Sequence, residues 1–473
     1  MTNKRQAIGK YLGPVLFLII YLCPTPLGMN ESAKIVAAIA CLMATWWIAE
    51  TIPFAITALL PFFLFPLFGV VSVEQVTNAY ANQIIFLFMA GFIFALCIER
   101  WNLHRRIALF TIKSFGFSPS RILLGFMVSS AFLSMWVSNT ATTLMMIPIA
   151  IAVASRIEPE NQQEKVFSIS LLLGIAYAAS IGGVATLIGT PPNAILAGIL
   201  EQQTGLSIGF LDWMKFGLPL SLMFLVTAWF YLNYLMKKNT VNQNLNGMDS
   251  LNNEIASLPP LSKEEKTVAW LFAAVCICWI GRGLIDLAIF KNIKDSTIGL
   301  LGASLLYLLP ANQGKQRLMD WQTTKKLPWE ILILFGGGFA LAAGFEQTQL
   351  THWLALQFSF LQGINILIVV FCIVLFVIFL TEITSNTATA TLLIPLMIAL
   401  SDTLDVSPVL LAAAVAVATS YAFMLPVATP PNAIVFSSGR VPIQKMVTVG
   451  FWLNIIGSIL ITFMVITLLP LLI

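Results

Sequence analysis

The sequence predicts an all-α polytopic membrane protein, with about 11 transmembrane helices and two re-entrant hairpins arranged as an inverted repeat. Three features support this fold class. Of the 473 residues, 58% are hydrophobic and only 10% are charged, whereas soluble domains carry roughly 25% charged residues. The apolar residues form repeated runs of about 20, the length that crosses a bilayer as a helix. Two polar motifs interrupt these runs, and each motif occurs twice.

The composition argues against several other classes of protein. The net charge of +4 is small and spread over loops, so it supplies no basic patch for nucleic acid. The six cysteines show no CxxC spacing and lie mostly in apolar segments, as small core residues do. His104 and His352 are the only histidines, which argues against a histidine-based metal or hydrolase site. We therefore expect neither a nucleic-acid-binding protein nor an enzyme.

The apolar runs place the expected spans along the chain. Lys4, Arg5 and Lys10 precede the first run, from Tyr11 to Leu27, and predict an uncleaved first helix with a cytoplasmic N-terminus. The expected membrane spans cover residues 12–28, 33–50, 53–71, 83–99, 167–203, 212–236, 267–285, 296–311, 329–346, 408–439 and 447–470.

Two further stretches, at 120–154 and 364–399, are expected to enter and leave the membrane on one side. The first is too long for one helix and is interrupted by Ser138-Asn139-Thr140. Arg121 and Arg156 flank its two ends, which indicates a return to the same side. We therefore interpret both stretches as re-entrant hairpins.

The remaining segments are polar, mixed or rich in glycine. Segments 105–117 and 350–362 suit helices that lie at the membrane interface. Residues 237–266 are polar and predict a cytoplasmic linker, which ends in a capping box from Ser262 to Glu265. Gly336 to Gly338 are expected to allow close packing of helices.

The two polar motifs show that the chain is built from two copies of one unit. Ser138-Asn139-Thr140-Ala141-Thr142 recurs as Ser385-Asn386-Thr387-Ala388-Thr389, a shift of 247 residues. Thr190-Pro191-Pro192-Asn193-Ala194-Ile195 recurs as Thr429-Pro430-Pro431-Asn432-Ala433-Ile434, a shift of 239 residues. The polar loop from Arg156 to Lys165 accounts for the difference between the shifts. A duplicated polar motif at membrane depth indicates a transporter site between two repeats.

The distribution of basic residues predicts that the two copies have opposite orientations. The first copy carries, after Glu99, the basic residues Arg100, Arg105, Arg106, Lys113 and Arg121. The second copy has no lysine or arginine from Leu327 to Gly439 and carries Asp402 and Asp405 in its loop. By the positive-inside rule, the first segment faces the cytoplasm and the second faces outside. We therefore predict a multi-pass protein of the cytoplasmic (inner) membrane, with its C-terminus outside.

Each Pro-Pro pair predicts a broken helix in the middle of the membrane. Proline lacks an N–H donor and disfavours helix before it, so carbonyl groups near Gly189 and Ala428 are freed for a cation. The following half-helix presents its N–H groups to an anion. The shift of 247 residues also aligns Ser134 with Thr381, each a hydroxyl one helical turn before its motif serine and a further candidate cation ligand. Neither motif contains lysine or arginine, so helix N-termini and bound cations must supply the positive charge for an anion.

Acidic residues near these motifs have two interpretations. Glu99 and Glu346 lie at the ends of predicted spans, where anchoring or capping is favoured over proton transfer. Glu382 lies three residues before Ser385. It either neutralises or orients the second site, or it forms hydrogen bonds within its hairpin.

At these residues the chain resembles the divalent anion/sodium symporter (DASS) family of dicarboxylate, tricarboxylate and sulfate transporters. The paired Ser-Asn-Thr motif and the stretch from Ser420 to Asn432 carry the resemblance, which extends over nearly the whole chain. It implies a homodimer whose protomers each have a fixed scaffold and a mobile, elevator-type transport domain. By this resemblance the scaffold comprises residues 1–118 and 267–363, and the transport domain comprises residues 119–236 and 364–473, with the linker at 237–266.

The resemblance also implies a set of ligands. The first sodium site would comprise Ser134, Ser138, Asn139 and the backbone at Gly189. The second would comprise Thr381, Thr384, Asn386 and the backbone at Ala428. The substrate site would comprise Ser138, Asn139, Thr140, Thr190, Pro191, Ser385, Asn386, Thr387, Thr429 and Pro430.

The function that this resemblance implies is sodium-coupled symport of a di- or tricarboxylate, with a C4-dicarboxylate such as succinate as the first choice. No basic residue replaces a sodium ligand in either motif, which favours a symporter that co-transports sodium ions. A sodium-independent dicarboxylate or citrate exchanger and a sulfate symporter are the alternatives. The discontinuous helices favour alternating access over a channel. The expected partners are the dicarboxylate, Na+, the lipid bilayer and a second copy of the chain.

Overall fold

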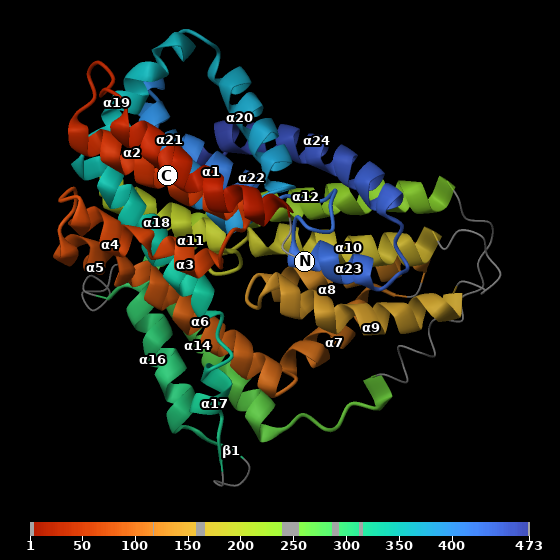
Figure 1. Cartoon of the computed structure of the whole chain (residues 1–473). Coiled ribbons are helices and arrows are strands. Elements are labelled where there is room, and N and C mark those ends of the chain that lie inside the picture. Colours follow the sequence, from red (N-terminus) through yellow and green to blue (C-terminus); the bar gives the residue numbers. More distant parts are fainter. Residues whose placement is uncertain are drawn as a thin grey trace.

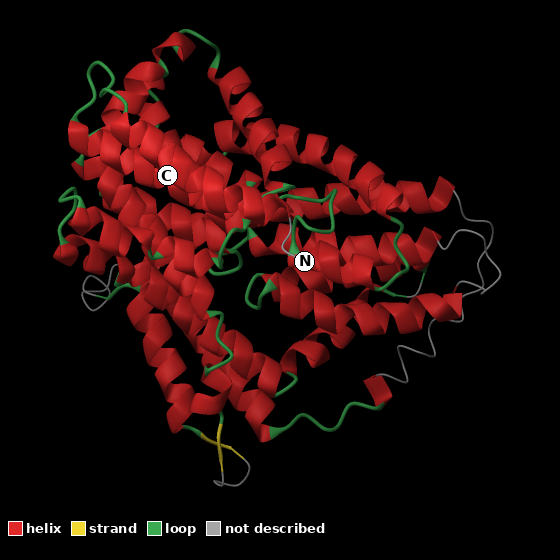
Figure 2. Cartoon of the chain, viewed as in Figure 1, coloured by secondary structure: helices red, strands yellow, loops and turns green. Residues whose placement is uncertain are grey.

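The computed structural model describes residues 4–116, 118–157, 166–238, 255–285, 293–311 and 316–471. Helices make up most of this part of the chain (Figures 1 and 2). Its strands are the two-residue β1 (Pro310–Ala311) and β2 (Gln316–Arg317), which pair antiparallel. Most of the loop predicted from Arg156 to Lys165, at 158–165, and much of the linker predicted at 237–266, at 239–254, lie outside the described residues.

The first half of the chain runs from α1 to α12. Its helices are α1 (Lys4–Leu22), α2 (Glu31–Ala49), α3 (Phe54–Ala58), α4 (Leu60–Leu67), α5 (Val73–Tyr80), α6 (Gln83–Arg100), α7 (Leu103–Phe115), α8 (Pro119–Ser134), α9 (Asn139–Ile157), α10 (Val166–Gly183), α11 (Pro191–Thr204) and α12 (Phe210–Lys238).

The second half begins after the linker. Its helices are α14 (Lys263–Leu284), α16 (Asp295–Leu308), α17 (Trp321–Thr324), α18 (Trp329–Gln347), α19 (Leu350–Gln357), η2 (Ser359–Leu361), α20 (Ile366–Thr381), α21 (Asn386–Leu404), α22 (Pro408–Ala418), α23 (Pro430–Ser437), α24 (Ile443–Thr467) and η3 (Leu469–Leu471).

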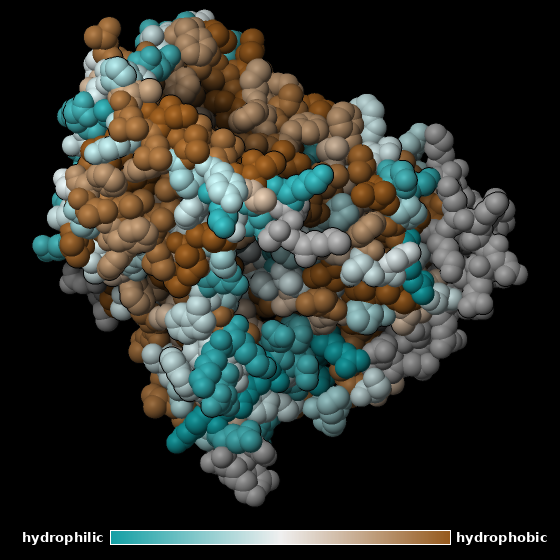
Figure 3. Space-filling model, in the orientation of Figure 1, coloured by the Kyte–Doolittle hydropathy of each residue, from teal (hydrophilic) through white to brown (hydrophobic). Residues whose placement is uncertain are grey.

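These helices confirm an all-α, multi-pass membrane architecture. Eight helical segments among the described residues are long and apolar enough to cross a bilayer, and shorter apolar helices supplement them. Apolar side chains cover much of the surface in Figure 3, for example over α1, where Leu22 is 74% exposed. A surface of this kind faces lipid, because the bilayer core solvates apolar groups and not polar ones.

Every predicted interruption of a helix is present. The hairpin α8–α9 turns at residues 135–138, and the hairpin α20–α21 turns at residues 382–385. The broken spans α10–α11 and α22–α23 are interrupted at residues 184–190 and 419–429. In Figure 1 the two hairpins extend away from the centre of the molecule in different directions, so that their turns approach each other there.

Two local expectations differ from the structure. The span predicted at 53–71 consists of two short helices, α3 and α4, because Pro61 has no N–H group to continue the hydrogen-bond ladder of α3. Helix α5, which begins at a capping box formed by Ser72 and Gln75, was not predicted from the sequence. The capping box expected at the end of the linker is present, since the Ser262 hydroxyl accepts a hydrogen bond from Glu265 N–H at 3.0 Å.

Close approaches between backbones hold the centre of the fold together. Helix α10 is buried along most of its length among α8, α9, α12 and α23 (Figure 1). Gly336, Gly337 and Gly338 of α18 also lie in close contacts, as expected. A Cβ atom on Gly337 would lie 2.2 Å from the carbonyl oxygen of Ala58, and one on Gly336 would lie 2.2 Å from the Tyr80 ring. Only hydrogen atoms fit into these gaps.

Gly182 provides a test of this packing. A Cβ atom there would lie 2.2 Å from the Ala131 carbonyl oxygen of α8, which is backbone and cannot rotate away. We expect Gly182→Ala to separate α8 from α10 and to cost about 1–3 kcal/mol. A lower thermal unfolding temperature of the detergent-purified protein measures this. Gly281→Ala is the control, because the nearest atom lies 4.0 Å from its added Cβ, and it should unfold like the wild type. Equal unfolding temperatures for both variants would contradict the close packing of α8 and α10.

Candidate functional site

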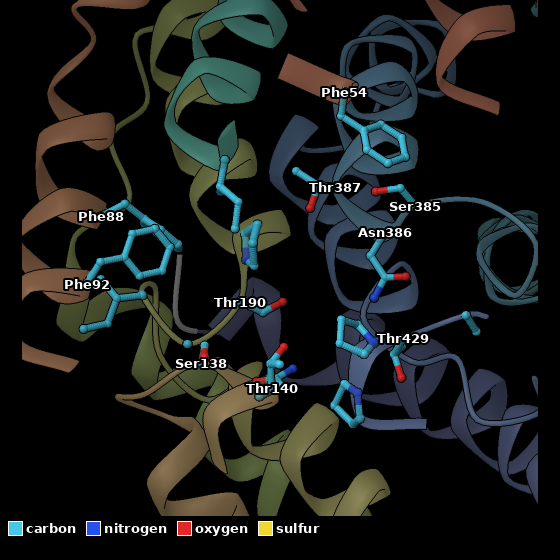
Figure 4. A pocket seen from close by; sticks show the side chains of 18 of the residues that line it. Phe54, Phe88, Phe92, Ser138, Thr140, Thr190, Ser385, Asn386, Thr387 and Thr429 are labelled. Carbon is cyan, nitrogen blue, oxygen red and sulfur yellow. The ribbon is translucent and has the colours of Figure 1, made fainter. Parts of the chain in front are cut away.

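The turns of the two hairpins and the breaks of the two interrupted helices enclose one central cavity. Its volume is about 320 Å³. Every residue that the sequence assigned to the anion site lines it: Ser138, Asn139, Thr140, Thr190, Pro191, Ser385, Asn386, Thr387, Thr429 and Pro430. Figure 4 shows Ser138, Thr140 and Thr190 facing Ser385, Asn386, Thr387 and Thr429 across the cavity. Residues almost 250 positions apart in the sequence therefore face each other here.

The remaining wall of the cavity is largely apolar. The rings of Phe54, Phe88, Phe92 and Trp136 line it, and Figure 4 shows Phe88 and Phe92 on the side of the first hairpin. Glu50 is the one charged side chain among the lining residues that the structure describes, and these include no lysine, arginine or histidine. An anion in this cavity would therefore depend on N–H groups, hydroxyl groups and bound cations.

The first hairpin turn gathers oxygen atoms beside the break of α10–α11. The Ser134 hydroxyl, in the last turn of α8, donates a hydrogen bond to Asn139 Oδ1 at the start of α9. A Cβ atom on Gly183 would lie 2.9 Å from Asn139 Oδ1 and 3.1 Å from the Gly189 carbonyl oxygen, so these two oxygens flank the same backbone position. The Ser138 hydroxyl accepts a hydrogen bond from Ala141 N–H at 3.2 Å. The four residues assigned to the first sodium site thus lie together.

The second hairpin turn repeats this arrangement. The Thr381 hydroxyl donates to Asn386 Oδ1 at 2.7 Å and lies 3.2 Å from the Thr419 carbonyl oxygen. Thr384 and Ala428 line the cavity beside Asn386. The Thr384 hydroxyl is already hydrogen-bonded, to the Leu380 carbonyl at 2.9 Å and to the Thr389 hydroxyl at 2.7 Å. It would have to leave these partners to bind an ion in the cavity.

The asparagine of the repeated Thr-Pro-Pro-Asn motif has a structural role that was not predicted from the sequence. Asn193 is fully buried, and its amide nitrogen lies 3.3, 3.2 and 2.7 Å from the carbonyl oxygens of Gly183, Val184 and Thr186. Asn432 is equally buried, and its amide nitrogen donates to the carbonyls of Ala422 and Leu425 at 3.0 and 3.1 Å.

These amide groups donate to carbonyl groups of the interrupted backbone. Some of these carbonyls have a second partner, since the Val184 carbonyl also accepts from Trp213 Nε1 at 2.8 Å and the Leu425 carbonyl from Ala428 N–H at 3.2 Å. An unpaired carbonyl is costly in a membrane interior, where water is scarce. The signal for this role was present in the sequence, because asparagine follows Pro-Pro in both copies. The sequence did not show which backbone carbonyls lie next to this asparagine in the folded chain.

The breaks of the two copies also contact each other directly. The Thr190 hydroxyl lies 3.4 Å from the Ser420 hydroxyl, and both residues are buried. The Thr429 hydroxyl, in contrast, accepts a hydrogen bond from Asn432 N–H at 3.3 Å and caps α23. The two interrupted helices therefore form one joint wall of the cavity.

With this geometry established, comparison with known proteins identifies the family. Residues 5–473 match the family described as the sodium:sulfate symporter transmembrane region. The chain belongs to this family. The match confirms the resemblance to divalent anion/sodium symporters and agrees with a transporter rather than an enzyme.

Relatives of known name are similar over nearly the whole chain. The sodium-dependent dicarboxylate transporter SdcS of Staphylococcus saprophyticus is 43% identical over 478 residues, which span 99% of this chain and 92% of that protein. SdcS of Staphylococcus aureus strain USA300 is 43% identical over 475 residues, which span 98% of this chain and 91% of that protein.

Two solved structures share the fold at low sequence identity. The YdaH transporter of Alcanivorax borkumensis aligns with a TM-score of 0.62 and 12% identity, over 98% of both chains. MtrF of Neisseria gonorrhoeae aligns with a TM-score of 0.61 and 12% identity, over 98% of this chain and 95% of that one. At this identity the likeness concerns the fold alone.

The asparagines that hold the breaks can be tested by removing their amide groups. We expect Asn193→Ala and Asn432→Ala each to remove hydrogen bonds to buried carbonyl groups and to cost about 1–3 kcal/mol. Thermal unfolding in detergent measures the effect. Asn78→Ala, at an exposed asparagine of α5, is the matched control and should leave the unfolding temperature unchanged. A wild-type unfolding temperature for both buried variants would refute the structural role.

Proposed function

We propose that the protein is a sodium-coupled symporter of dicarboxylates, with a C4-dicarboxylate such as succinate as its substrate. The observation that carries this proposal is the central cavity, where two hairpin turns present carboxamide and hydroxyl groups from opposite sides. Its lining has no basic side chain among the described residues. The relatives named sodium-dependent dicarboxylate transporters support the choice of ion and substrate.

Each end of the dicarboxylate would meet one hairpin turn. Asn139 and Thr140 begin α9, and Asn386 and Thr387 begin α21, so amide and hydroxyl donors accompany the free N–H groups of a helix N-terminus at both turns. The N-termini of α11 and α23 add the same partial positive charge behind Thr190 and Thr429.

Sodium would bind beside each turn, next to the anion. The hydroxyl and amide oxygens of Ser134 with Asn139, and of Thr381 with Asn386, already lie within hydrogen-bonding distance of one another. Rotation of each hydroxyl proton away from the amide oxygen exposes two lone pairs to a cation. Ser138 and the Gly189 carbonyl complete the first site, and Thr384 and the Ala428 carbonyl complete the second.

Movement of the site across the membrane would use the two bodies expected from the family resemblance. Residues 119–236 and 364–473 form the transport domain, which moves as an elevator, and residues 1–118 and 267–363 form the scaffold of a homodimer. The contacts of α9 and α10 with α23, and of α11 with α21 and α22, support a single transport body, because they join the two hairpins and the two broken helices.

Polar contacts between these bodies suit an interface that opens and closes. At the end of α11, Glu201 accepts hydrogen bonds from Gln83 Nε2 at 2.8 and 2.6 Å and lies 3.3 Å from Lys294 Nζ. Gln83 and Lys294 belong to the scaffold ranges. Such contacts break at a lower cost than buried apolar packing does, since water replaces the partners. We place the protein in the cytoplasmic (inner) membrane, with its N-terminus inside and its C-terminus outside.

Two other functions fit the cavity less well. A sulfate symporter would need to hold one compact anion, whereas the cavity of about 320 Å³ has donor groups on two opposing turns. A sodium-independent exchanger of dicarboxylate or citrate would need a substitute for the sodium charges, and no basic side chain among the described lining residues provides one.

Transport into proteoliposomes tests the proposal. We expect radiolabelled succinate to accumulate with an inward sodium gradient and not when choline replaces sodium. Equal uptake in both buffers would exclude symport, and fast sodium-independent exchange against internal succinate would establish the exchanger. Uptake of labelled sulfate in place of succinate would establish the sulfate symporter.

The two asparagines of the hairpin turns test the position of the site. We expect Asn139→Ala and Asn386→Ala each to abolish sodium-driven uptake, because each removes an oxygen ligand of sodium and a donor to the anion together. Both variants should remain folded by size-exclusion chromatography. The exposed variant Asn78→Ala is the control and should transport at the wild-type rate. Wild-type transport with unchanged sodium dependence in either turn variant would place the site elsewhere.

A further inference from the structure

The second cation site has a neighbour that the first lacks. Glu382 directly follows Thr381 in the turn of the second hairpin and is only 3% exposed. The shift of 247 residues that aligns the two hairpins places Met135 at the corresponding position of the first copy. One of the two otherwise similar turns therefore carries an acidic side chain at membrane depth, where such groups are rare and usually functional.

The partners of Glu382 lie outside its own hairpin. Its Oε1 atom accepts hydrogen bonds from Phe423 N–H at 2.7 Å, from Met424 N–H at 2.8 Å and from Asn454 Nδ2 at 2.7 Å. Its Oε2 atom accepts one from Leu425 N–H at 2.9 Å. The expectation of hydrogen bonds within the hairpin is therefore wrong, because the carboxyl group connects the hairpin to the break between α22 and α23.

This set of partners favours the ionised form of the carboxyl group, against the cost of burying a charge. All four groups are donors, and an ionised carboxylate is an acceptor at both oxygens. Hydrogen bonds from several backbone N–H groups favour the charged form. None of these four partners is a lysine or arginine, so the negative charge of Glu382 is directed at dipoles and is not paired with any of them as a salt bridge.

The first copy makes the corresponding connection without charge. There the Thr186 hydroxyl, in the break of α10–α11, donates at 2.6 Å to the backbone carbonyl of Met135 in the hairpin turn. The shift of 239 residues that aligns the breaks pairs Thr186 with Leu425, whose N–H group binds Glu382. The same two points of the repeat are thus joined by a neutral bond in one copy and by a carboxylate in the other.

The carboxylate also fixes the backbone that would complete the second site. Asn432 holds the carbonyls of Ala422 and Leu425, and Glu382 holds the N–H groups of residues 423–425 between them. The same loop continues to Ala428, the assigned backbone ligand, and the Thr381 hydroxyl at the start of the turn is an assigned side-chain ligand. Glu382 therefore sets the distance between the two parts of the second site.

We propose that Glu382 is a positioning residue that makes the two cation sites unequal, so that sodium binds more tightly at the second site. This inference rests on the proposed sodium symport. The negative charge of Glu382, which adjoins the assigned ligand Thr381 in the chain, attracts a cation at the second site in a medium of low dielectric constant, whereas Met135 at the corresponding position of the first copy is uncharged.

The test compares Glu382→Gln with the wild type in two measurements. Gln keeps the size of the side chain and removes its charge. The first measurement is the sodium concentration that gives half-maximal succinate uptake into proteoliposomes, which should rise about tenfold. The succinate KM at saturating sodium should stay within about twofold, because the anion donors are untouched. The second measurement is the unfolding temperature as a function of sodium concentration, without succinate. The sodium concentration that gives half of the maximal stabilisation should rise by the same factor.

Three further variants separate charge from structure. Glu382→Asp keeps the charge and should restore much of the sodium affinity. Asn454→Leu removes one donor but keeps the carboxylate, and it should leave the half-saturating sodium concentration near the wild-type value. Asp402→Asn removes an exposed charge from the end of the same hairpin and should change neither measurement.

The outcomes distinguish this inference from the proposed function. A wild-type protein that shows sodium dependence in both measurements, with Glu382→Gln unchanged in both, overturns the role of Glu382 and leaves symport intact. A Glu382→Gln variant with a lower maximal rate at unchanged sodium affinity also overturns it, since that is the effect of a merely structural residue. If Glu382→Gln does not fold, an equal loss of sodium affinity in Asn454→Leu and Glu382→Asp overturns it. A wild type without sodium dependence in either measurement refutes the proposed function itself.

Discussion

The structure depends on how the backbone carbonyl and N–H groups at a helix break find hydrogen-bond partners inside a membrane. A site at mid-membrane needs free carbonyl and N–H groups, and a continuous helix offers none. The Pro-Pro pairs create the breaks, and the amide groups of Asn193 and Asn432 then pair with the carbonyls that the breaks release. One short motif therefore contains both the interruption and the group that stabilises it. The remaining carbonyls beside the cavity are left for a ligand.

The repeat supplies two similar hairpin turns, and the differences between them make the two sides of the cavity chemically unequal. In both turns a hydroxyl from the preceding helix donates to the asparagine of Ser-Asn-Thr. The neutral bond between Thr186 and Met135 has its counterpart in the charged bonds of Glu382. Val137 is likewise aligned with Thr384, which adds a hydroxyl to the second turn only. Duplication thus explains the shared geometry, and single substitutions explain why the two halves need not bind ions alike.

The sequence predicted the helix breaks and the grouping of the anion residues, because both depend on local patterns. Proline pairs and apolar runs report where a membrane helix stops, and a repeated motif reports which stops are equivalent. It did not predict the division of 53–71 into α3 and α4 at Pro61. Nor could it predict the partners of Asn193, Asn432 and Glu382. Apart from the Asn454 side chain, those partners are backbone groups, and backbone groups carry no residue-specific signal until the chain curves to meet them.

The charges of the cavity give a physical reason for coupling ion to substrate. A dianion that leaves water for this cavity loses its hydration and meets Glu50 but no basic side chain among the described lining residues. A sodium ion that binds without the dicarboxylate is attracted by the charge of Glu382 but lacks the attraction of a bound anion. Each ligand therefore lowers the cost of desolvating the other, and the coupling is reciprocal by thermodynamic necessity. A fixed arginine in the cavity would bind the dianion without sodium and would remove that dependence. On the proposed mechanism, the absence of basic residues from the described lining is thus the feature that makes the sodium gradient able to drive uptake.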